Sequence, residues 1–204
     1  MTHTLNRRGL SEDRPHDEIV MLCMAQQKQK AQKQEAMKEI TRTILKHNPD
    51  NIMGAPLGAD DETIVATSAR AGIITAVFNS NEDVEQVVGE LKSKKLGVSV
   101  VLSGLFRDVR EVCRANDMKE HTYHISLGIF GKTDKLPDEK TLEVTTQCGH
   151  ALISPHLVKD IVKKIKKGKM TSDEGASLLV KPCICGIGNP KKIAKILDKM
   201  AEGE

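Results

Sequence analysis

The chain has 204 residues, 39% of them apolar, and a formal net charge of +3. A chain of this length can bury an aliphatic core without disulfide bonds, and its near-balanced charge argues against a nucleic-acid-binding protein. Only four residues are aromatic, too few to build both a core and the stacking surfaces that sugars and single-stranded nucleic acids usually require.

The sequence shows no signal for secretion or membrane insertion. The first twenty residues carry several charges and lack the apolar stretch of a signal peptide. No apolar run approaches the roughly 20 residues of a membrane span. The five cysteines include the pair Cys183 and Cys185, a spacing more typical of metal or redox chemistry than of a structural disulfide. We therefore predict a cytoplasmic protein without a membrane partner.

As far as residue 146, predicted strands alternate with predicted helices. Helical spacing of apolar residues predicts helices at residues 26–47, between Ser80 and Gly97, and at 105–115. Apolar runs predict strands at residues 18–24, 72–78, 98–102, 122–129 and 142–146. This alternation favours an α/β fold with a mainly parallel sheet and flanking helices.

After residue 150 the pattern predicts helices only. Ser154 before Pro155, the pair Thr171 and Glu174, and Asn189 before a proline are three helix starts. We therefore predict two parts, an α/β sheet domain at residues 1–147 and a small all-helical metal-binding cap at residues 148–204. The cap is rich in lysine, with eleven lysines and no arginine after residue 150.

The strongest chemical signal lies in this cap. Cys148 and His150 follow the predicted strand 142–146, and Cys183 and Cys185 lie between two predicted helices. Three thiolates and an imidazole make a tetrahedral zinc site, and the same donors can hold an iron–sulfur cluster. Two alternatives remain, in which these residues are unconnected structural side chains or in which a thiol is nucleophilic or redox-active.

Other residues could complete such a site. Cys23 ends the first strand and could replace His150 as a ligand, which would free His150 for acid–base chemistry. Cys148 at a helix start would have a lowered thiol pKa. His124, on the predicted strand 122–129, is a second candidate catalytic base or ligand, and His3, Arg7 and Arg8 could fold over an active site.

Ser103 and Gly104 form a third candidate, a cofactor-binding turn. They lie between a strand and a helix, where free backbone N–H groups attract anions, and Arg107 and Arg110 follow. A plain tight turn would equally account for these residues.

Three hypotheses follow. The first is a metalloprotein with an iron–sulfur cluster or zinc that performs redox or metal-assisted chemistry on a small molecule or with a redox partner. The second is a non-enzymatic, zinc-stapled binding module whose lysine-rich surface contacts an acidic partner. The third is a metal-free thiol enzyme that uses Cys148 with His150 or His124. The sequence leaves the oligomeric state open, although aliphatic α/β proteins often form homodimers.

Overall fold

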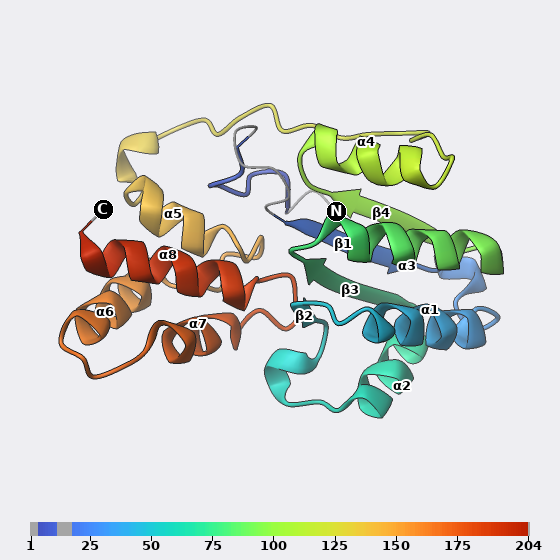
Figure 1. Ribbon diagram of the computed structural model, residues 1–204, viewed down its shortest axis with the longest axis horizontal. Coiled ribbons are helices and arrows are strands. Elements are labelled where there is room, and N and C mark those ends of the chain that lie inside the picture. Colours follow the sequence, from blue (N-terminus) through green and yellow to red (C-terminus); the bar gives the residue numbers. More distant parts are fainter. Residues whose placement is uncertain (1–3, 12–17, 204) are drawn as a thin grey trace. The chain divides into compact units, whose positions relative to one another are not determined.

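The computed structural model describes residues 4–11 and 18–203, which divide into two compact units (Figure 1). The sheet unit comprises residues 10–123 and 185–187. The helical unit comprises residues 4–9, 124–184 and 188–203. Each unit therefore contains segments that are far apart in the sequence. The predicted boundary after residue 147 stays a prediction.

The sheet has four strands in the spatial order β2-β3-β1-β4, and every neighbouring pair is antiparallel. The predicted strands at 18–24, 72–78 and 98–102 are confirmed, and the short β2 was not predicted. The strands are β1 (Ile19–Met24), β2 (Asn51–Ile52), β3 (Ile73–Phe78) and β4 (Ser99–Ser103).

The prediction of a mainly parallel sheet is wrong, and the topology gives the reason. Helix α1 joins β1 to β2, which run in the same direction, and α3 (Asn81–Lys94) likewise joins β3 to β4. However, β3 lies between β1 and β2, and β1 lies between β3 and β4. The two crossover units interleave, so each strand pairs with strands of opposite direction. Alternation along the sequence cannot reveal this interleaving.

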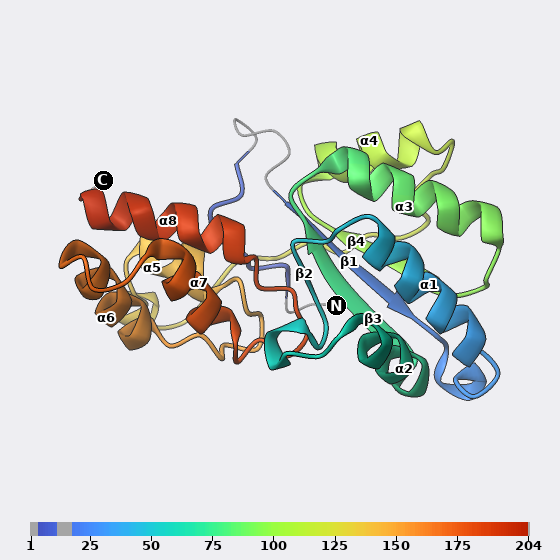
Figure 2. The same cartoon turned by 60° about the horizontal axis from the view of Figure 1, so that its bottom comes forward.

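The core of the sheet unit lies between one face of the sheet and four helices (Figure 2). On the strands it takes alternate residues, such as Met21 of β1 and Ala76 of β3, as the pleat requires. The chain's only buried aromatic ring, Phe78, belongs to this core. The helices are α1 (Gln34–Lys46), α2 (Asp61–Ala71), α3 and α4 (Phe106–Ala115).

Residues 185–187 lie against the face of the sheet opposite the core, where Thr75 points. The Thr75 hydroxyl of β3 donates a hydrogen bond to the Cys185 carbonyl. Gly186 adopts a left-handed backbone conformation (φ 63°), and a Cβ there would lie 2.1 Å from the carbonyl carbon of Ile52. Only glycine permits this contact between two backbones.

Two other predicted strands are absent from the structure. Residues 142–145 belong to helix α5 (Glu139–Thr145), and Thr146 is its C-cap. Asp138 caps the first turn of this helix by accepting a hydrogen bond from the Thr141 amide at 2.9 Å. Residues 122–129 lie outside any helix or strand and are exposed. Helix α2 was not predicted, and the predicted helix at 26–47 begins only at Gln34, after a single 3-10 turn.

The helical unit packs four helices, and the three predicted helix starts after residue 150 are confirmed by side-chain caps. Gly175 lets three of these helices approach closely, because a Cβ there would lie 2.6 Å from Ile161 and 3.2 Å from Leu197. No helix in the described part of the chain combines the length and apolar character needed to cross a bilayer. The helices are α5, α6 (Pro155–Lys166), α7 (Ser172–Val180) and α8 (Pro190–Glu202).

Candidate thiol site

The structure brings together two of the predicted ligands, Cys148 and Cys183. Cys148 follows α5 and Cys183 follows α7, and both side chains are buried, with 2% and 0% of their surface exposed. Their thiol groups are hydrogen-bonded to each other. Residues 35 positions apart in sequence therefore meet inside the helical unit, and that they share a metal site stays a prediction.

The turn after Cys148 wraps around its sulfur. The backbone N–H groups of His150 and Leu152 both donate to the Cys148 sulfur, and the Ala151 amide closes the turn on the Cys148 carbonyl at 2.9 Å. Ala151 takes a positive φ of 56° to make this turn. Two amide donors on one sulfur favour its thiolate form, as occurs when a cysteine binds a metal.

The Cys148 thiol nevertheless has a raised pKa. The hydrogen bond that the Cys148 thiol donates to Cys183, together with burial, raises the pKa of Cys148 above its ordinary value, and these effects outweigh the two amides. The prediction of a lowered pKa at a helix start is therefore wrong. Cys148 follows the C-terminal end of α5 and lies before the N-cap of α6, Ser154, so it is not itself at a helix start.

The other two predicted ligands, His150 and Cys185, are not buried as Cys148 and Cys183 are. His150 lies on the same turn as Cys148, and its side chain is exposed. Cys185 is half-buried and belongs to the sheet unit through the bond from Thr75 to its carbonyl. Among residues 4–11 and 18–203, no cluster of three or more His, Cys, Asp or Glu side chains is arranged to hold a metal ion. The four-residue ligand set stays a prediction.

Buried polar residues surround the thiol pair, and the sequence interpretation missed most of them. The Arg7 guanidinium is buried and donates to the carbonyl oxygen of Gln147 at 2.7 Å. The side-chain oxygen of Gln147 accepts from the Asn189 amide at 3.3 Å, and Asn189 caps α8 by accepting from the Lys192 amide at 3.0 Å. Gln147, the residue before Cys148, is thereby held both by its backbone carbonyl and by its side chain.

The N-terminal segment that includes Arg7 and Arg8 lies on α5. The Arg8 amide donates to the Thr146 hydroxyl at 2.9 Å, and a Cβ on Gly9 would lie 2.7 Å from the Glu143 carboxylate. Since Gln147 precedes Cys148 in the chain, this contact places Arg7 one residue from the thiol pair. His3, the third residue of that prediction, lies outside the described residues.

Of the remaining candidate residues, Cys23, Ser103 and Gly104 belong to the sheet unit, and His124 belongs to the helical unit. His124 is exposed on the segment after α4. Ser103 and Gly104 end β4, and Arg110 of the following helix pairs with Glu120 at 3.3 Å. Cys23 is buried in β1, and burial raises the pKa of its thiol to about 12. The sheet thus shields the Cys23 thiol from solvent and disfavours its thiolate form.

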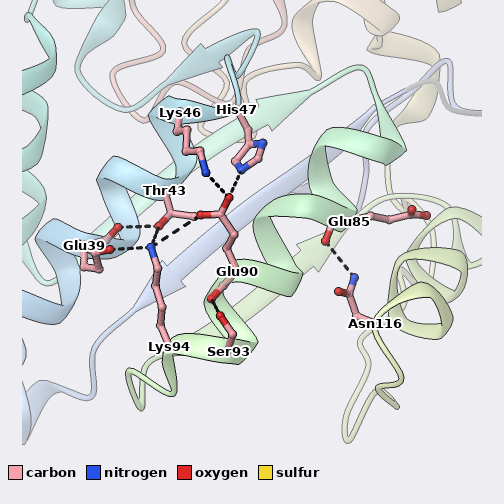
Figure 3. Close-up of polar contacts among 9 residues, drawn as sticks. All are labelled: Glu39, Thr43, Lys46, His47, Glu85, Glu90, Ser93, Lys94 and Asn116. Atoms are coloured by element: carbon pink, nitrogen blue, oxygen red, sulfur yellow. Dashed lines mark hydrogen bonds and ion pairs between the residues drawn. The ribbon is translucent and has the colours of Figure 1, made fainter.

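A separate polar cluster joins α1 to α3 in the sheet unit (Figure 3). The Glu90 carboxylate accepts from Lys46 at 2.6 Å and from the His47 ring at 2.9 Å, and these two hydrogen bonds lower the pKa of Glu90 to about 2. Beside it, Lys94 contacts Glu39 at 2.6 Å. All these groups are paired across two helices, so the cluster connects α1 to α3.

Comparison with known proteins found no relative of this chain. No protein-family model, no curated protein and no solved structure matches this chain.

Proposed function

We propose that this protein holds a metal centre, an iron–sulfur cluster or zinc, through the thiolates of Cys148 and Cys183, and uses it in redox or metal-assisted chemistry on a small molecule. The observation that carries this proposal is the meeting of two buried sulfurs, one of them wrapped by two backbone amides. A metal ion replaces the thiol protons and gains both sulfurs as ligands at once.

The surroundings support a metal centre better than a nucleophilic thiol. A nucleophile needs solvent access and a thiolate near neutral pH, whereas the Cys148 thiol is buried and its pKa is raised. A metal ion displaces the proton and removes this obstacle. The hydrogen bonds that fix Gln147 hold the Cys148 backbone in place, as the surroundings of a metal site usually do.

In this proposal His150 is the third ligand or an acid–base group, because it lies on the Cys148 turn and its ring is exposed. Cys185 is the proposed fourth ligand, on the grounds of its spacing from Cys183. His124 and the turn at Ser103 and Gly104 remain proposed contacts for a substrate or cofactor.

The test is metal and sulfide analysis, with an absorption spectrum, on protein purified without oxygen. Wild type is compared with Cys148→Ser, Cys183→Ser and the control Cys113→Ser, which changes a half-buried thiol of α4. Iron with sulfide and a broad visible band, lost in the first two variants and kept in the control, supports a cluster. Stoichiometric zinc with the same pattern supports a zinc centre.

Metal that survives loss of either thiol, or the absence of metal from wild type, refutes the proposal. In the second case an oxidised protein whose two thiols form a disulfide supports the alternative of a redox-active thiol pair. Variants Cys185→Ser and His150→Ala, tested in the same way, determine which residue completes the ligand set.

A second candidate function is a zinc-stapled binding module for an acidic partner. The observation in its favour is the set of exposed lysines in and after α6, namely Lys163, Lys166, Lys167 and Lys169. Their neighbours Lys159 and Lys164 pair with Asp138 at 3.4 Å and Asp160 at 2.8 Å. Tightly held zinc without an exchangeable coordination position, together with unfolding on chelation, distinguishes this candidate from a catalytic centre.

A further inference from the structure

The segment at residues 122–130 presents an apolar face to solvent. Its sequence alternates as a strand does, with Tyr123, Ile125, Leu127 and Ile129 on one side, followed by Phe130. All five side chains are exposed; Leu127 and Phe130 have 83% and 81% of their surface exposed. Within the described residues this segment pairs with no strand.

One polar residue of the same segment, Ser126, is tied to the N-terminal part of the helical unit. The Ser126 hydroxyl donates to the Asn6 side chain and accepts from the Gly128 amide at 3.0 Å. A contiguous exposed apolar strip of this kind marks a surface that another molecule covers.

A second unpaired feature is the open edge of the sheet. Strand β4 has only β1 as a neighbour among the described strands. Residues 96–105 contain no charged residue and no proline, the usual devices that block pairing at an edge. Val100 and Val101 remain 39% and 38% exposed. This edge is suited to accept a further strand.

We propose that two copies of the chain form a dimer in which residues 122–130 of each copy add as a strand to the β4 edge of the other. Both halves of this contact are present in the chain, and among the described strands β4 pairs only with β1 and residues 122–130 pair with none. The segment's contacts within its own chain involve side chains, such as the edge-to-face packing of Tyr123 on Phe106. In a single chain residues 124–130 belong to the helical unit, where Asn6 holds Ser126, and not to the sheet unit.

The chemistry of the two surfaces favours a second copy as the occupant. The edge and the apolar side of the segment are uncharged, so two identical copies meet without charge repulsion. A twofold exchange pairs both edges and covers both strips in a closed assembly, as most soluble homo-oligomers do.

The first test is the molar mass of the full chain in solution, by light scattering during size-exclusion chromatography. Wild type, Leu127→Lys and Val101→Lys are compared with the control Leu57→Lys, which changes a similarly exposed leucine (69%) on a 3-10 turn elsewhere. We expect dimers for wild type and control, and monomers for the two other variants. A monomeric wild type, or a dimer that persists in both variants, overturns the proposal.

The second test locates the contact without a disruptive charge. A Leu127→p-benzoylphenylalanine variant is prepared with natural nitrogen and with nitrogen-15, the two samples are mixed and irradiated, and cross-linked peptides are identified by mass spectrometry. Peptides that join residue 127 to β4 of the other isotope support the exchange. Cross-links only within one isotope show that the segment adds to its own sheet, and this overturns the dimer.

Discussion

The contact between Gly186 and Ile52 gives the sharpest prediction on stability. Gly186→Ala places a methyl group where the carbonyl of β2 lies, 2.1 Å from its carbon atom. Backbone of a paired strand cannot move aside as a flexible side chain can, because Ile52 is paired with Ala76. We expect residues 185–187 to detach from the sheet unit.

The cost can be worked out from the contacts that are lost. Alanine in a left-handed conformation costs about 1 kcal/mol relative to glycine. Detachment breaks the hydrogen bond from Thr75 to Cys185, worth about 1 kcal/mol, and exposes the fully buried Ile187, worth about 2 kcal/mol. The free energy of unfolding should therefore fall by about 4 kcal/mol.

A matched control separates steric conflict from backbone strain. Gly168 has the same φ of 63°, but a Cβ there meets no atom within 4 Å. Gly168→Ala should lose only about 1 kcal/mol in urea unfolding followed by circular dichroism. Hydrogen exchange at residues 50–53 and 185–187 should accelerate only in Gly186→Ala. Equal destabilisation of the two variants would refute the reasoning.

Three further predictions concern packing, pH and reactivity. Gly175→Ala should destabilise the protein by about 1–3 kcal/mol, because the added Cβ would lie 2.6 Å from Ile161. This steric cost should exceed the gain from alanine's higher helix propensity. Thermal unfolding measures the effect, and an unchanged melting temperature would contradict it. Glu90 stabilises the fold as a carboxylate at pH values above 4.5, and this contribution is lost as pH falls towards its folded pKa of about 2. Glu90→Gln should flatten that part of the stability profile, whereas Lys46→Met should weaken the dependence without abolishing it. Cys23 should resist iodoacetamide in native protein and react once urea unfolds the sheet; labelling in the native state would show that β1 opens.

The sequence predicted individual elements better than their arrangement. Buried strands such as Ile73–Phe78 are recognisable because a continuous apolar run too short for a helix usually forms a strand in the core. Residues 142–146 misled the prediction because Leu142 and Val144 alternate as in a strand, and the Asp138 cap that starts a helix lies outside that window. The segment at 122–130 does alternate as a strand, but the described part of the chain supplies no partner strand for it.

For the candidate site too, the sequence suggested some of the residues and missed others. Side-chain chemistry and spacing predicted a metal site of Cys148, His150, Cys183 and Cys185; the structure places Cys148 in contact with Cys183, and the metal site stays a prediction. The residues that fix their backbone were missed, because Gln147 and Asn189 act through peptide groups and helix caps that carry no motif. Which metal binds, and through which further ligands, depends on binding affinity. The spacing of residues in the sequence does not determine that affinity.

The discontinuity of the two units has a consequence for biosynthesis. The sheet unit lacks residues 185–187 until most of the chain has been made, and the helical unit needs both residues 4–9 and α8. Domains usually fold one after another as they leave the ribosome. Here neither unit can be completed before the C-terminal part of the chain emerges, so no single cut in the gene yields an intact half. The thiol pair is likewise assembled late, because Cys183 must emerge before Cys148 has its partner.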